Sequence, residues 1–106
     1  MIRDNIKDFT VAAFRLYGHR DTAAPADSKI IKAVETTLAH LDTNGERETV
    51  NVVCRVYVAL PLGRLCKGEI SARVARVATD MYMSERNAWR RLARARKLFE
   101  QYYDEH

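Results

Sequence analysis

Apolar residues recur at helical spacing along most of this chain of 106 residues, and short polar breaks separate one apolar stripe from the next. The first stripe consists of Ile6, Phe9, Ala13 and Leu16. Gly18 follows the stripe and is a residue type that often ends a helix. We therefore predict a first helix that ends at Gly18.

A second helix is predicted between a small loop at 19–26 and a turn at 42–45. Asp27 or Ser28 is expected to cap it, because side-chain oxygens of these types accept hydrogen bonds from the free N–H groups of a first helical turn. The turn reads Asp-Thr-Asn-Gly, a strong turn sequence. The apolar side of this helix consists of Ile30 or Ile31, Val34, Leu38 and Leu41.

A third helix is predicted from Glu46 to Leu60, ending before Pro61. Its centre is rich in valine, which also suits a strand. We predict a helix because the chain offers no strand to pair with it and because its apolar residues fit helical spacing. These residues are Val53, Val56, Tyr57 and Leu60.

The stretch from Glu69 to Lys97 predicts two helices joined by a short turn, and the second helix is rich in arginine. Ser84 is placed to cap the second helix, which is expected to continue to about Tyr103. Its apolar stripe consists of Ala88, Leu92, Ala95 and Phe99. At about 100° per residue, the opposite side carries Arg86, Arg90 and Lys97, with Arg94 beside them.

These patterns together predict an all-α fold of about five helices in one compact domain, residues 1–106. Residues 69–103 form its helix-turn-helix part, and residues 1–60 are expected to brace that part. Ala78 is the small residue that lets the two motif helices cross closely, and Met83 is the apolar residue before the Ser84 cap. Tyr82 occupies the turn position where glycine is usual, which leaves open a longer or differently shaped turn.

The charge is distributed unevenly along the chain. The total is +4, but residues 1–60 carry eight basic and eight acidic side chains and sum to zero. Residues 61–97 carry ten cations against Glu69, Asp80 and Glu85, which gives +7. A polyanionic partner would therefore meet the C-terminal part of the protein.

The residues from Met83 to Arg86, with Ala88, Trp89, Leu92 and Ala95 behind them, resemble the helix-turn-helix of sigma-factor region four. They are similar also to small phage regulators of the RinA and ArpU type. The resemblance covers roughly 69–99. It implies a phage or prophage transcriptional regulator that binds double-stranded DNA. Separately, we expect the N-terminal helices to offer a surface for a second copy of the chain or for RNA polymerase.

On this hypothesis the helix that begins at Ser84 enters the major groove with its N-terminal end first. The residues expected to contact bases are Glu85, Arg86, Trp89 and Arg90. The residues expected to contact the DNA backbone are Arg64, Lys67, Arg73, Arg76, Asn87, Arg94 and Lys97.

Three other functions fit the same features less well. They are a helical protein-interaction module whose basic surface binds an acidic partner, the DNA-recognition part of a phage terminase small subunit, and an RNA-binding protein. The histidines are scattered, no phosphate-binding glycine loop is present, and Cys54 and Cys66 match no metal or redox pattern. We therefore expect no enzyme, no cofactor and no metal, with both cysteines as free thiols.

No apolar run approaches the length of about 18 residues that a membrane span needs, and no signal peptide is visible. The expected location is therefore the cytoplasm, without membrane contact.

Overall fold

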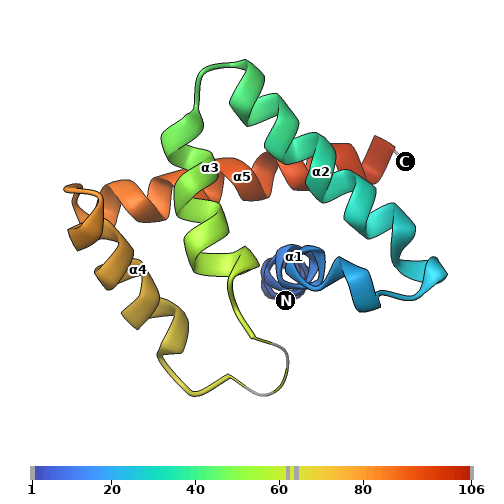
Figure 1. Cartoon of the computed structure of the whole chain (residues 1–106), viewed down its shortest axis with the longest axis horizontal. Helices are drawn as coiled ribbons and strands as arrows, with labels where there is room; N and C mark the ends of the chain where they lie inside the picture. The colour runs from blue at the N-terminus through green and yellow to red at the C-terminus, as the bar shows by residue number, and fades with distance from the viewer. Residues whose placement is uncertain (1, 62, 64, 106) are drawn as a thin grey trace.

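The longest helix, α5 (Glu85–Glu105), is the element against which the other helices pack. In the computed structural model, which describes residues 2–61, 63 and 65–105, α5 contacts α1, α2, α3 and α4. Its 21 residues span about 30 Å at the usual rise of an α-helix. Figure 1 shows α5 crossing the whole molecule behind α2 and α3.

The predicted all-α fold is confirmed, and the described residues contain no strand. The remaining helices and helical turns are α1 (Ile2–Gly18), η1 (Arg20–Thr22), η2 (Pro25–Asp27), α2 (Ser28–Thr43), α3 (Arg47–Val53), η3 (Cys54–Val58) and α4 (Glu69–Asp80). None of the helices in these ranges combines the length and apolarity needed to cross a bilayer.

A set of aromatic rings joins the N-terminal helix to the C-terminal one. The ring centroid of Phe14 lies 5.7 Å from that of Phe99 and 6.1 Å from that of Tyr57, and all three residues are buried. Aromatic pairs at such separations add stability beyond that of the area they bury. The two ends of the chain therefore share one core.

The first helix buries more than the predicted stripe. Ala13 is buried and Phe9 packs partly buried against the core, as predicted, but Phe14 and Thr10 are also fully buried. Leu16 is only half-buried. The side chain of Ile6 lies outside the described residues.

The predicted cap of the second helix is wrong, although α2 does begin at Ser28. No side chain caps its first turn. The Asp27 carboxylate instead accepts a hydrogen bond from the backbone N–H of Ala24 at 3.3 Å. It thereby stabilises the short turn η2, which begins at Pro25, rather than α2.

The third helix differs from its prediction in its last turns. α3 starts at Arg47 and widens at Cys54 into the π-helical turn η3, where the N–H of Ala59 donates to the carbonyl of Cys54, five residues back, at 2.9 Å. The end of η3 lies against Gly18, the last residue of α1. A Cβ added at Gly18 would lie 2.1 Å from the carbonyl oxygen of Val58, so only glycine fits this contact without a shift.

Candidate nucleic-acid interface

The turn between α4 and α5 is short despite its tyrosine. The N–H of Tyr82 donates to the carbonyl of Thr79 at 3.2 Å, and the N–H of Met83 donates to that of Ala78 at 2.9 Å. This pair of bonds ends a helix when one residue adopts the left-handed conformation. That residue is Tyr82, with φ of 55°. The turn is therefore short rather than longer, and Tyr82 adopts the conformation that glycine usually has at this position.

Ser84 caps α5 as predicted. Its hydroxyl oxygen accepts a hydrogen bond from the backbone N–H of Asn87 at 3.1 Å. This satisfies one of the donors that a first helical turn leaves free, and it fixes the residue at which α5 begins.

The predicted apolar stripe of α5 is confirmed. Ala88, Leu92, Ala95 and Phe99 are all buried, with exposures of 0–1 %. On the facing helix α4, Val74, Val77 and Ala78 are buried, and α4 and α5 are in contact. The motif therefore has a packed interior, which determines the side of α5 that faces outward.

The outward side of α5 carries the predicted cations. Arg86, Arg90 and Lys97 are exposed, and within the described residues none of them makes an ion pair. Glu85 is exposed beside them, and Trp89 keeps 39 % of its surface in solvent. The four residues expected to contact bases therefore lie together in the first turns of α5.

The residues expected to contact the DNA backbone differ from one another in exposure and in ion pairing. Lys67 and Arg76 are exposed, and neither makes an ion pair with another described residue. Arg73 is half-buried and lies 3.8 Å from the carboxylate of Glu69 on the same helix. The side chain of Asn87 is half-buried. Arg64 lies outside the described residues.

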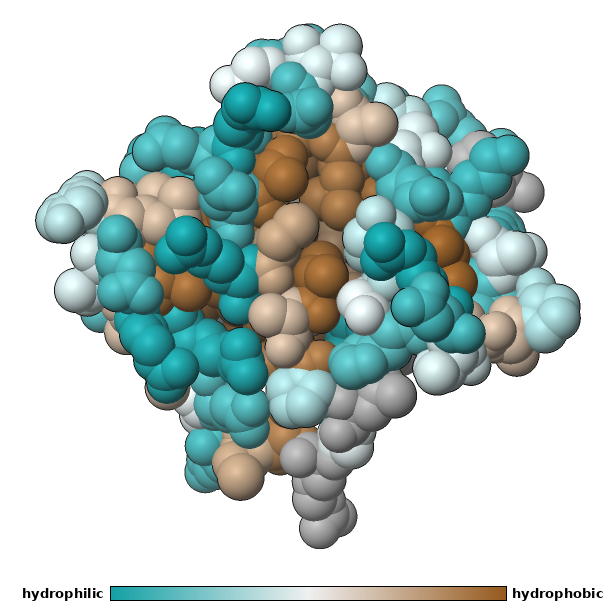
Figure 2. Space-filling model, in the orientation of Figure 1, coloured by the Kyte–Doolittle hydropathy of each residue, from teal (hydrophilic) through white to brown (hydrophobic). Residues whose placement is uncertain are grey.

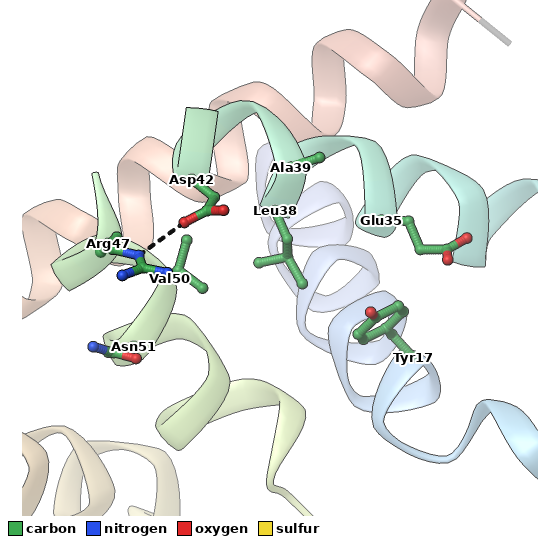
Figure 3. Close-up of a pocket in the computed structure, with 8 residues that line it drawn as sticks. All are labelled: Tyr17, Glu35, Leu38, Ala39, Asp42, Arg47, Val50 and Asn51. Carbon is green, nitrogen blue, oxygen red and sulfur yellow. Dashed lines mark hydrogen bonds and ion pairs between the residues drawn. The ribbon is translucent and has the colours of Figure 1, made fainter. Parts of the chain in front are cut away.

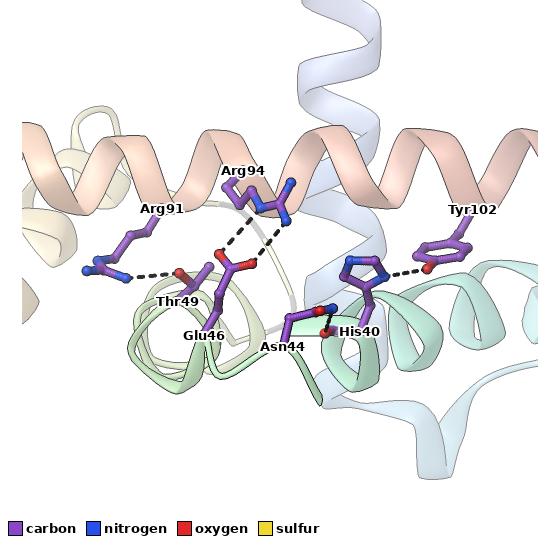
Figure 4. A network of polar contacts seen from close by, with 7 residues as sticks. All are labelled: His40, Asn44, Glu46, Thr49, Arg91, Arg94 and Tyr102. Carbon is purple, nitrogen blue, oxygen red and sulfur yellow. Dashed lines mark hydrogen bonds and ion pairs between the residues drawn. The ribbon is translucent and has the colours of Figure 1, made fainter. Parts of the chain in front are cut away.

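Arg91 and Arg94 of α5 point towards the start of α3 and bind side chains there (Figure 4). The guanidinium of Arg94 donates from Nη2 to the carboxylate of Glu46 at 3.0 Å. Arg91 donates to Glu48 and to the hydroxyl of Thr49, both at 3.0 Å. We call these contacts of Arg91 and Arg94 the α3–α5 tie.

The tie bears on the expected role of Arg94 as a phosphate contact. Its guanidinium has a carboxylate partner, Glu46, while its side chain keeps 45 % of its surface in solvent, so a phosphate would compete with Glu46 for it. The same tie corrects the charge argument, because Glu46 and Glu48 come from the electrically balanced N-terminal part and neutralise two cations of the basic segment. The charge of +7 for residues 61–97 therefore overstates what a polyanion would meet.

The electrostatics of the tie favour the charged forms of both partners. The hydrogen bond from Arg94, opposed by partial burial and assisted by the nearby positive charges, lowers the pKa of Glu46. The same bond raises the pKa of Arg94. Sequence reasoning missed Glu46, Glu48 and Thr49 because more than forty positions separate them from their arginines.

A concave surface lies among the N-terminal helices. A groove of about 730 Å³ separates α1, α2 and α3, and apolar surface gathers in this hollow (Figure 2). In Figure 3, Leu38 of α2 and Val50 of α3 line it, with Glu35 towards one end and the Arg47–Asp42 ion pair towards the other. The groove is open, and its side chains form no arrangement of nucleophile and base.

The described histidines have structural partners. A ring nitrogen of His19 lies 3.0 Å from the carbonyl oxygen of Leu60, and Nδ1 of His40 lies 2.6 Å from the hydroxyl of Tyr102. Cys54 and Cys66 are free thiols, and burial raises the pKa of Cys54. Within the described ranges, no three His, Cys, Asp or Glu side chains gather as a metal site would require.

Comparisons of the chain with protein-family models, with curated proteins and with solved structures found no match.

Proposed function

We propose that this protein is a DNA-binding transcriptional regulator that reads duplex DNA with the N-terminal half of α5. The observation that carries the proposal is the outward side of α5, where Arg86 and Arg90 are exposed and unpaired within the described residues, directly behind the capped N-terminus. A helix of this kind fits the major groove, where arginine donates two hydrogen bonds to guanine.

The finer form of the proposal rests on the likeness to sigma region four and to phage regulators. It gives a phage or prophage origin, with RNA polymerase or a second copy of the chain as a partner of the N-terminal helices. The same surface would serve the DNA-recognition part of a terminase. A binding site selected from random DNA would support a regulator, and its symmetry would report on dimerisation.

Phosphate contacts should make the binding depend on salt. Among the residues expected to contact the DNA backbone, three cations are exposed and make no ion pair with a described residue: Lys67, Arg76 and Lys97. If each neutralises one phosphate, the slope of log affinity against log salt should be about −2.7. Fluorescence anisotropy with a labelled duplex at several salt concentrations measures this slope.

Substitutions along α5 test which residues read sequence. Arg86→Ala and Arg90→Ala should each cost about 1–3 kcal/mol at the selected site and relax its sequence preference. Lys97→Ala should weaken all duplexes alike and reduce the slope by about 0.9. Arg94→Ala is the matched control, because its guanidinium is held by Glu46, and it should change the slope little.

Two results would contradict the proposal. One is a slope near zero, and the other is a random-library selection that enriches no sequence. Equal binding to an acidic polypeptide and to DNA, without sequence preference, would instead favour the protein-interaction module.

A further inference from the structure

Among the residues that the structure describes, Tyr82 is the only one other than glycine with a positive φ, which is 55°, and 97 % of the residue's surface is exposed. The left-handed conformation costs free energy for any residue with a Cβ. A side chain so fully in solvent recovers none of that cost by packing. The fold therefore gains nothing from a tyrosine at this position.

The chain contains a second turn of the same type that shows what the fold alone requires. At the end of α2, the N–H of Gly45 donates to Asp42 at 3.1 Å and that of Glu46 to Leu41 at 2.8 Å, the same pair of bonds as in the α4–α5 turn. The left-handed residue here is a glycine, with φ of 77°. Glycine would thus form the turn at Tyr82 as well, and without the strain that a Cβ brings.

The position of Tyr82 suggests what its side chain does instead. It lies two residues before Ser84, the cap of α5, and so at the N-terminal end of the helix that carries Arg86 and Arg90. When such a helix enters a major groove by its N-terminus, the turn before it comes close to the sugar–phosphate strand at the edge of the groove. A tyrosine hydroxyl is one of the groups that donate to phosphate oxygens there.

We propose that Tyr82 is a DNA-backbone contact whose hydroxyl donates to a phosphate oxygen while its ring lies against the adjoining sugar. This inference rests on the proposed function. It adds a contact residue that carries no charge, so its contribution is separable from that of the arginines. Residues that sacrifice stability in this way cluster at binding sites.

The test combines unfolding with binding. Tyr82→Gly should raise the urea midpoint of unfolding, because it removes the strain, and should lower the affinity for duplex DNA by about tenfold. Tyr82→Phe should leave the midpoint unchanged and lower the affinity by a smaller factor. Both should weaken selected and random duplexes equally and leave the salt slope unchanged, since no cation is lost.

Gly45→Tyr is the matched control, because this turn lies at a different corner of the molecule (Figure 1) and a Cβ at Gly45 would meet nothing within 4 Å. It should lower the unfolding midpoint and leave DNA affinity unchanged.

The outcomes separate the two proposals. If the parent protein binds no DNA, the proposed function and this inference both fail. If the parent binds and Tyr82→Gly binds equally well, only the contact of Tyr82 is refuted. A Tyr82→Gly variant that is less stable than the parent would refute the inference as well, because tyrosine would then serve the fold.

Discussion

Leu92 and Arg90 lie two positions apart on α5 and have opposite surroundings. Leu92 is fully buried, whereas Arg90 is exposed. Leu92→Ala should therefore leave a cavity and cost about 2–5 kcal/mol of unfolding free energy. Arg90→Ala should change that free energy by about 0.5 kcal/mol or less.

Urea unfolding of the parent and both variants measures the difference. A large loss for Arg90→Ala with an unchanged Leu92→Ala would mean that α5 is rotated from the orientation described above. The arginine would then face the protein, and the proposed DNA surface would have to be abandoned.

At the scale of single residues, the sequence predicts whether a side chain is buried better than it predicts which residue that side chain binds. The buried stripe from Ala88 to Phe99 follows from helical periodicity alone, because this pattern depends only on spacing within one helix. The carboxylate that binds Arg94 does not, because Glu46 lies directly before α3, and local spacing holds no information on which helices meet. The conformation of Tyr82 was left open by the sequence, because a tyrosine at a glycine position fits either a strained short turn or a longer one.

At the scale of elements, the contact between α1 and η3 predicts whether an alanine at Gly18 stabilises or destabilises the protein. Gly18→Ala would raise helix propensity, yet its Cβ would lie 2.1 Å from the carbonyl oxygen of Val58. Backbone must move to relieve this overlap, so we expect a loss of about 1–3 kcal/mol in unfolding free energy. Thermal or urea unfolding measures the loss.

Ala12→Gly is the control for that experiment, because Ala12 is exposed in the same helix. It should cost about 0.5–1 kcal/mol through backbone entropy alone. A Gly18→Ala variant as stable as the parent, or more stable, would contradict the close approach of α1 to η3.

The elements themselves were predicted where their signals are local. All five helices appear near their expected positions, and the predicted Ser84 cap is present. The widening of the third helix at Cys54 was not predictable, because no residue type is specific to a hydrogen bond that reaches five residues back. The missing cap of α2 shows a competition that composition cannot resolve, because Asp27 had two turns within reach.

At the scale of the whole molecule, the α3–α5 tie makes stability depend on pH. The pKa of Glu46 is lower in the folded protein than in the unfolded chain, because Arg94 donates to its charged form. Its contribution is therefore present above the pKa of an unfolded glutamate, about 4.3, and is lost as the pH falls through the lower folded value. The pair is partly exposed, so we expect it to contribute about 0.2–1 kcal/mol.

Glu46→Gln should accordingly reduce the unfolding free energy at pH 7, and its difference from the parent should shrink as the pH falls below the folded pKa. Urea unfolding at a series of pH values measures this. Glu35→Gln is the control, because Glu35 is exposed and makes no ion pair with a described residue. If the difference in unfolding free energy between Glu46→Gln and the parent grew towards low pH, folding would not lower the pKa of Glu46.

The position of α5 has a consequence for how a duplex would be accommodated. The helix that presents Arg86 and Arg90 also packs against Phe14 and the rest of the core. No hinge therefore separates the proposed DNA-contacting residues of α5 from the other helices. On the proposed function, a poor fit between protein and duplex would be absorbed by bending of the DNA. Sequences that bend easily would then be preferred even at base pairs that no side chain touches.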